Sequence, residues 1–249
     1  MGEDEQKIYR MPLIGDFAPE FKAKTTTGNI HFPDDYKGNW VIFFSHPSDF
    51  TPVCTTEFIK FSKMQDDFKQ LNTELLGLSV DSIYSHIAWI RTIEEKIEYK
   101  GLKNVEIKFP IIEDLSMEIS KKYGMIHPHA IYSTEEMLED FERSGGKISL
   151  DSGTSTIRAV FIIDPNGRIR AILYYPMSSG RNMDEVKRLL ISLQKSDSEN
   201  IETPEGWQPG DDVIIPPPEL SSMAKKRISE TDEKMICYDW FLCFRKENA

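Results

Sequence analysis

The chain has 249 residues with 41 acidic and 30 basic side chains, a formal net charge of −11, and three cysteines. So few cysteines exclude a disulfide-scaffolded fold, and the acidic balance argues against nucleic-acid partners, which need clusters of basic residues. The N-terminus lacks the basic and apolar regions of a signal peptide, and no apolar run reaches the ~20 residues of a membrane helix. We therefore expect a soluble, intracellular and cytoplasmic protein with no membrane partner.

Apolar runs that suit buried strands alternate with amphipathic helical segments along most of the chain. The expected strands are Trp40–Ser45, Glu74–Val80, Ala159–Asp164 and Arg168–Tyr175. Apolar residues at helical spacing mark three segments, namely Glu57 to Phe68, then Ile83, Ile87, Ile90 and Ile97, and last Val186, Leu189, Leu190 and Leu193. The turn Asp164-Pro-Asn-Gly167 makes the last two strands a hairpin. This order predicts an α/β fold with a mixed central sheet flanked by helices.

Two segments look like additions to this pattern. Residues 126–153 are polar and connect two core elements, so we expect a surface excursion. Further on, a stretch rich in turn formers ends in Pro216-Pro-Pro218, which favours an extended conformation. A helix is expected after it, at Glu219–Arg227, followed by an aromatic tail. The sequence thus predicts a compact domain at residues 1–195 and an extended C-terminal arm at residues 196–249.

Cys54 follows a buried strand and opens a helix. Thr51-Pro52 suits an N-cap followed by proline at the first helical position, which puts Cys54 at the third. The unpaired backbone N–H groups there favour an anion. A thiol in this position is therefore stabilised as the thiolate, which is the nucleophilic form. The alternative is a buried structural cysteine, as most free cysteines are.

The residues around Cys54 resemble a known family. The spacing Pro47-x-x-x-Thr51-x-x-Cys54 matches the peroxiredoxin signature, and the run HPSDFTPVCTTEF is similar to its one-cysteine-like and archaeal branch. Further matches are Gly15-Asp-Phe-Ala-Pro19, Arg158 before AVFIIDPNGRIR, Tyr174-Tyr-Pro-Met177, Gly180-Arg181-Asn182, Trp207-x-Pro-Gly and Val213-Ile-Ile-Pro-Pro-Pro218. The resemblance implies a thioredoxin-like fold, which agrees with the alternation of strands and helices. It also implies a thiol peroxidase, for which we expect no cofactor.

The resemblance implies that Cys54 is the peroxidatic cysteine. Its thiolate attacks a peroxide oxygen and becomes a sulfenic acid. Thr51, through its hydroxyl, and Arg158, through its guanidinium, hold the peroxide and the thiolate. The substrates implied are hydrogen peroxide and organic hydroperoxides.

Four further residues match the surroundings of the family's active site. Pro47 is expected to shield the site from water. Glu57 and Arg181 resemble the ion-pair network that orients Arg158. His46 lies next to the pocket, where it is expected to bond the substrate or the oxidised sulfur.

A sulfenic acid must be resolved by a second thiol, and Cys237 and Cys243 are the candidates. Their context, CYDWFLC, resembles the archaeal branch, in which the cysteine after the tryptophan forms a disulfide with a neighbouring subunit's peroxidatic cysteine. The resemblance gives that role to Cys243 and leaves Cys237 as an alternative partner. The apolar tail suits an interaction site or a docked terminus. It is alternatively an aromatic anchor in which the two cysteines are incidental.

A cross-subunit disulfide implies a homodimer, and the branch commonly assembles five dimers into a ring. The sulfur of Cys54 must also reach its partner, so we expect the first helical turn, Thr51–Glu57, to unwind on oxidation. A thioredoxin- or glutaredoxin-like dithiol protein is the expected reductant.

The sequence also bears on two other kinds of function, a metal site and a non-enzymatic redox protein. A zinc site favours two cysteines two to four residues apart with further ligands nearby, and neither Cys237 with Cys243 nor His127 with His129 fits, so we expect no metal. A redox-regulated chaperone or a peroxide sensor would also keep Cys54. Repeated peroxide consumption with a dithiol marks an enzyme, whereas consumption of one equivalent marks a sensor. We expect an enzyme.

Overall fold

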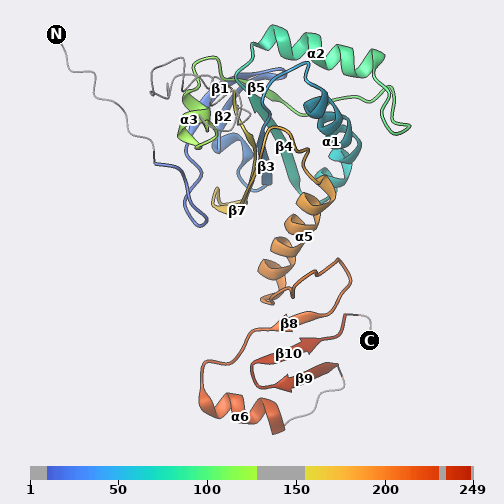
Figure 1. Cartoon of the computed structure of the whole chain (residues 1–249). Coiled ribbons are helices and arrows are strands. Elements are labelled where there is room, and N and C mark those ends of the chain that lie inside the picture. The colour runs from blue at the N-terminus through green and yellow to red at the C-terminus, as the bar shows by residue number, and fades with distance from the viewer. Residues whose placement is uncertain (1–9, 128–154, 230–233, 248–249) are drawn as a thin grey trace, which may run out of the picture. The chain divides into compact units, whose positions relative to one another are not determined.

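The computed structural model describes residues 10–127, 155–229 and 234–247 (Figure 1). The polar excursion expected at residues 126–153 lies almost wholly outside these ranges. The chain divides into two compact units, residues 1–181 and 182–249. The domain boundary expected at 195 falls inside helix α5 (Met183–Glu199), which belongs to the second unit.

The first unit contains a seven-stranded mixed sheet with the order β2-β1-β5-β4-β3-β6-β7. Its strands are β1 (Phe21–Thr25), β2 (Gly28–Phe32), β3 (Trp40–Ser45), β4 (Thr73–Ser79), β5 (Ile111–Glu113), β6 (Arg158–Ile163) and β7 (Ile169–Tyr175). Strands β3, β4 and β5 run parallel, while β6 pairs antiparallel with β3, and β7 pairs antiparallel with β6. The predicted α/β fold with a mixed sheet is confirmed. Strands β1 and β2 form a hairpin at the other edge and were not predicted, because their short polar sequences lack a continuous apolar run.

Helices cover both faces of this sheet (Figure 1). They are the 3₁₀ helix η1 (Asp34–Tyr36), α1 (Pro52–Gln70), α2 (Ile83–Lys96) and α3 (Glu118–Lys122). Successive residues of a strand point to opposite faces, and β3 shows the result. Phe44 stacks on Phe61 of α1 with ring centroids 4.3 Å apart, whereas Phe43 meets Tyr123, directly after α3, edge-on at 4.9 Å. Every residue of β3 and of β6 is buried, which explains their continuous apolar sequences.

The turn between β6 and β7 is the predicted hairpin connection. The Asp164 carboxylate accepts hydrogen bonds from the backbone N–H groups of Asn166 and Arg168, each at 2.9 Å. Gly167 has φ +79°, a conformation that glycine adopts without a steric cost. The hairpin holds β6, and with it Arg158, next to β3 in the middle of the sheet.

Helix α2 lies where the sequence places it, but it buries another face. The buried side chains are His86, Trp89 and Ile93, whereas Ile87 is 53% exposed. The isoleucines at helical spacing therefore do not make up the buried face, because His86 and Trp89 take positions on it.

The second unit follows α5 with β8 (Val213–Ile215), α6 (Ser221–Ser229), β9 (Met235–Asp239) and β10 (Leu242–Arg245). The three strands form a small antiparallel sheet in the order β8-β10-β9. Ile201, Trp207 and Val213 form a small core of their own. The expected C-terminal extension is present, but it is folded rather than extended, because β9 and β10 pair as a hairpin. Within the described ranges, no helix combines the length and the apolar character needed to cross a membrane.

Candidate active site

Cys54 lies in the first turn of α1, as the sequence predicts. Thr51 is the N-cap residue and Pro52 the first helical residue, so Cys54 is the third. Its side chain is fully buried. The hydroxyl of Thr51 does not cap the helix but donates to the carbonyl oxygen of Ser48 at 2.8 Å. Since a hydroxyl has one proton and two lone pairs, Thr51 retains the capacity to accept a hydrogen bond.

Arg158, the first residue of β6, is in contact with the thiol. Its Nη1 lies 3.2 Å from Cys54 Sγ and 2.9 Å from Glu57 Oε2, and its Nε donates to the carbonyl oxygen of Met177 at 2.9 Å. The guanidinium is therefore fixed on two sides by acceptors other than the sulfur. It presents a cation to the buried sulfur in a defined orientation.

Glu57 joins Arg158 to Arg181. Arg181 binds both carboxylate oxygens of Glu57, with Nη2 to Oε2 at 2.7 Å and Nε to Oε1 at 3.0 Å, and its backbone N–H adds a bond of 2.8 Å. Burial alone would raise the pKa of Glu57, but the charge and hydrogen bonds of Arg181, together with the charge of Arg158, hold it below the ordinary value. Glu57 is therefore a carboxylate at neutral pH.

The charged side chains beside Cys54 sum to one positive charge. Arg158 and Arg181 contribute two positive charges and Glu57 one negative charge, and all three side chains are almost completely buried. A Cys54 thiolate would bring the sum to zero. Because an uncompensated buried charge is costly, the excess positive charge makes this a suitable place for an anion next to Arg158.

His46 and Pro47 directly follow β3 in the sequence, and both side chains are buried. No described hydrogen bond joins His46 to Cys54. His46 Nε2 lies 2.9 Å from Asp49 Oδ1, and Asp49 Oδ2 lies 2.9 Å from His86 Nδ1. Neither Asp49 nor His86 was predicted from the sequence to belong to the site. Asp49 stands inside the run that matches the family signature, so it could have been noticed, whereas His86 is isolated on α2 and leaves no local pattern.

Cys237 and Cys243 form a disulfide with each other. They are cross-strand partners of β9 and β10, with Cα atoms 4.0 Å apart. Cys243 is buried and Cys237 is exposed. Both cysteines were candidates for pairing with Cys54, and their pairing with each other was not predicted from the sequence. A hairpin turn at Trp240-Phe241 alone would place Cys243 opposite Tyr238, and the register shift between Leu242 and Cys243 brings it opposite Cys237 instead.

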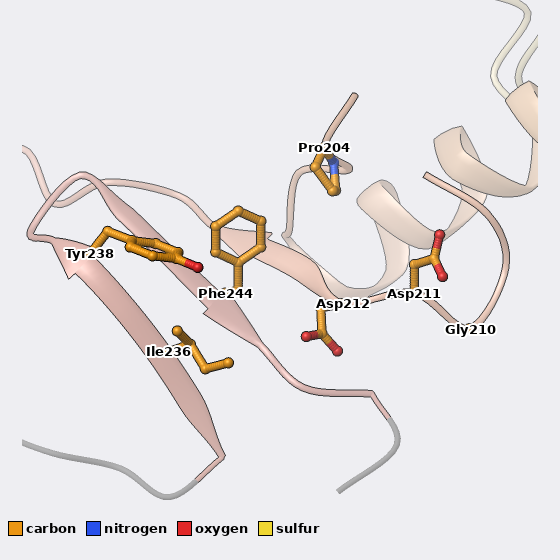
Figure 2. A pocket seen from close by; sticks show the side chains of 7 residues that line it. All are labelled: Pro204, Gly210, Asp211, Asp212, Ile236, Tyr238 and Phe244. Carbon is orange, nitrogen blue, oxygen red and sulfur yellow. The ribbon is translucent and has the colours of Figure 1, made fainter. Parts of the chain in front are cut away.

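A cavity of about 480 Å³ lies in the second unit beside the same hairpin (Figure 2). The rings of Tyr238 and Phe244 lie edge-to-face in it, with centroids 6.1 Å apart. The other lining residues are Pro204, Gly210, Asp211, Asp212 and Ile236. Because neighbouring residues of a strand face opposite sides, Phe244 and the adjacent Cys243 lie on different faces of the small sheet. The cavity therefore contains none of the residues predicted for catalysis.

Comparisons with known proteins agree with this geometry. Residues 14–172 match the AhpC/TSA family, and residues 192–231 match the C-terminal domain of 1-Cys peroxiredoxin. A peroxiredoxin of Methanosarcina mazei is 57% identical over 95% of this chain and 99% of its own. One of Thermotoga maritima is 45% identical over 95% and 98%.

Solved structures show the same relationship. The yeast mitochondrial 1-Cys peroxiredoxin matches with a TM-score of 0.74 and 38% identity, over 95% of this chain and 100% of that one. A cysteine-to-serine mutant of peroxiredoxin 6 from Arenicola marina matches with a TM-score of 0.74 and 30% identity, over 95% and 98%. These matches confirm the thioredoxin-like fold predicted from the sequence. The chain therefore belongs to the peroxiredoxin family of thiol peroxidases.

Proposed function

We propose that the chain reduces hydrogen peroxide and organic hydroperoxides through Cys54. The observation that carries this proposal is the 3.2 Å contact between Arg158 Nη1 and Cys54 Sγ, made by a guanidinium that Glu57 holds in place. The thiolate attacks one peroxide oxygen, the O–O bond breaks, and the other oxygen takes a proton and leaves as water or an alcohol. Arg158 stabilises the charge on the departing oxygen. Thr51, whose proton is engaged by Ser48, accepts a hydrogen bond from the peroxide hydroxyl.

The remaining pocket residues act around this step. Pro47, which is buried, shields the sulfur from water. Glu57 and Arg181 position Arg158 through the contacts of their buried ion pair. His46 Nδ1 is buried and has no hydrogen-bond partner among the described residues, so it is available to accept a bond from the peroxide or from the sulfenic acid.

Resolution uses the C-terminal cysteines. Cys243 of a neighbouring subunit attacks the sulfenic sulfur of Cys54, which forms a disulfide and releases water. The Cys237 thiolate then attacks the Cys243 sulfur, frees the Cys54 thiol and closes the Cys237–Cys243 disulfide. A thioredoxin- or glutaredoxin-like dithiol reduces that disulfide by two exchange steps. The hairpin disulfide supports this sequence, as does the similar yeast protein, whose thiol resolving mechanism runs via glutathione/thioredoxin systems.

The cycle requires at least a homodimer, and a ring of five dimers is the assembly we propose. The cytoplasm is the proposed compartment, since thiols are kept reduced there. Neither nucleic acid nor a membrane takes part in the cycle.

A coupled peroxidase assay tests the function. Wild type should consume hydrogen peroxide and an organic hydroperoxide repeatedly when supplied with a thioredoxin- or glutaredoxin-like dithiol, and Cys54→Ser should consume neither. Cys243→Ser should react once and then stop with these reductants. Consumption of a single equivalent by wild type would identify a sensor and contradict the enzyme.

A further inference from the structure

Three buried side chains from separate parts of the first unit form a hydrogen-bonded chain. His46 follows β3, Asp49 lies in the loop before α1, and His86 is on α2. His46 Nε2 lies 2.9 Å from Asp49 Oδ1, Asp49 Oδ2 lies 2.9 Å from His86 Nδ1, and His86 Nε2 lies 3.1 Å from the carbonyl oxygen of Ile112. His46 and His86 are fully buried. These hydrogen bonds end at His46 Nδ1, a buried atom that has no hydrogen-bond partner within the described part of the molecule.

The hydrogen-bond acceptors next to the two histidines determine which of their ring nitrogens carry protons. Burial opposes ionisation of Asp49, but its hydrogen bonds with His46 and His86 outweigh burial and keep the pKa of Asp49 well below its usual range. Asp49 is thus a carboxylate, and a carboxylate and a backbone carbonyl can only accept. Both ring nitrogens of His86 face such acceptors, so both carry protons and His86 is a cation. His46 Nε2 faces Asp49 and carries one proton.

This arrangement keeps the other nitrogen of His46 unprotonated. Burial lowers the pKa of His46 even though Asp49 favours its charged form, and the nearby His86 lowers it further. The remaining charged neighbour is Asp81, which accepts from the backbone N–H of Asp49 at 2.9 Å. The rings of Phe58 and Trp89, packed on the imidazole at 4.8 and 5.1 Å, supply no charge. A second proton on His46 would have no acceptor and no free countercharge.

We propose that His86 is a positioning residue for the peroxidase reaction, which acts through Asp49 to keep His46 Nδ1 a bare hydrogen-bond acceptor. His86 neutralises the Asp49 carboxylate, and Asp49 in turn fixes the His46 tautomer by accepting from Nε2. The inference rests on the proposed function, because it gives His46 its acceptor role toward the peroxide or the sulfenic acid.

A bound metal is the competing explanation for the same residues. The nearest ligand atoms of His46, Asp49 and His86 lie within 4.8 Å of one another, and a zinc ion binds such donors at about 2.0–2.2 Å. A metal ion bound there would take the place of the protons on His46 Nε2 and His86 Nδ1, which face the Asp49 carboxylate. Metal analysis of the purified protein therefore forms part of the test.

The test compares wild type with His86→Asn by nitrogen NMR of ¹⁵N-labelled histidine and by the rate of Cys54 oxidation. Asparagine can donate to Asp49 but carries no charge, so the carboxylate should then draw a second proton onto His46. In wild type, the NMR signal should show His46 Nδ1 unprotonated between about pH 5 and 8, whereas in the variant this nitrogen should titrate.

The kinetic readout is the ratio of the variant's rate constant for Cys54 oxidation to that of wild type. This ratio should fall by up to about tenfold for each pH unit below the new pKa of His46. His31→Asn is the matched control, since His31 pairs with Asp34 on the surface at 3.4 Å.

Several outcomes would overturn the proposal. They are a protonated Nδ1 on His46 in wild type, a singly protonated His86, a stoichiometric metal, or a His46 signal that His86→Asn leaves unchanged. A rate ratio independent of pH would overturn the role in catalysis. If His86→Asn does not fold, the wild-type spectrum alone still decides the protonation states. A wild type that shows the expected spectrum but turns over no peroxide would refute the proposed function and leave the assignment of the protons intact.

Discussion

In the proposed reaction, the peroxide chemistry depends most on Arg158, because its guanidinium contacts both the sulfur of Cys54 and the carboxylate of Glu57. Ionising an ordinary thiol completely raises its thiolate fraction at pH 7 by only about thirtyfold. A less basic thiolate is also a weaker nucleophile, which offsets much of that gain. Most of the acceleration must therefore come from stabilising the departing oxygen and aligning the O–O bond.

Replacing this guanidinium should separate the two contributions. Arg158→Met is expected to lower the rate constant for peroxide by at least about a hundredfold, the scale measured for loss of one oxyanion donor, while the rate of Cys54 alkylation falls much less. Stopped-flow peroxide kinetics and alkylation of the same samples measure both rates. Arg170→Met, on β7, is a control outside the site. A variant that reduces peroxide at a near-normal rate would refute the role of Arg158.

The site residues could be predicted to different degrees. Cys54 could be placed in the helix from Thr51-Pro52 alone, by the chemistry of helix starts. The partners Arg158 and Arg181 were found only through the family resemblance, since side chains more than 100 residues away in the chain leave no local pattern. His86 was missed for a related reason, because its partner Asp49 is on another element and a single histidine on α2 forms no pattern in the sequence.

At the scale of elements, buried strands were the most predictable feature. Strands β3 and β6 are covered on both faces, so their sequences are continuously apolar. The hairpin of β9 and β10 was not predicted, because most of its residues are exposed or half-exposed and its aromatic residues suggest a docking segment as readily as a strand.

Glu57 ties α1 to β6 and to the segment after β7, and its removal should weaken the fold. Glu57→Gln leaves two buried guanidiniums without their carboxylate and is expected to lower the free energy of unfolding at pH 7 by about 3–5 kcal/mol. The folded-state pKa of Glu57 is lowered from 4.5, so its stabilisation is complete above that value and is lost as the pH falls through the folded-state pKa. Urea unfolding of both proteins at pH 7 and near pH 3 should show the difference shrink. An equal difference at both pH values would contradict the assignment.

At the scale of the whole molecule, the reacting cysteine and the C-terminal pair belong to different units of the chain. The Pro-rich segment led the sequence to predict an arm from residue 196, whereas the second unit already begins at Asn182, before α5. The sequence also could not show that the two C-terminal thiols form a disulfide with each other. Such pairing depends on strand register, which the cysteine spacing alone does not specify.

Non-reducing electrophoresis after one equivalent of peroxide should assign the two thiols. We expect pre-reduced Cys243→Ser to form no disulfide-linked dimer. Cys237→Ser should form the dimer and retain it, because the thiol that releases Cys54 is missing. Pre-reduced wild type should pass through the dimer and end with the hairpin disulfide. A dimer that persists in Cys243→Ser and disappears in Cys237→Ser would exchange the two roles.

The balance of charges around Cys54 has a consequence for motion. When the thiolate becomes a neutral sulfenic acid, Glu57 alone faces two guanidiniums, and one positive charge is left without compensation in a region closed to water. In the proposed cycle, oxidation removes an anion from beside the two guanidiniums. We therefore expect the first turn of α1 to be less stable in the sulfenic acid than in the thiolate, which would help the sulfur to meet another thiol.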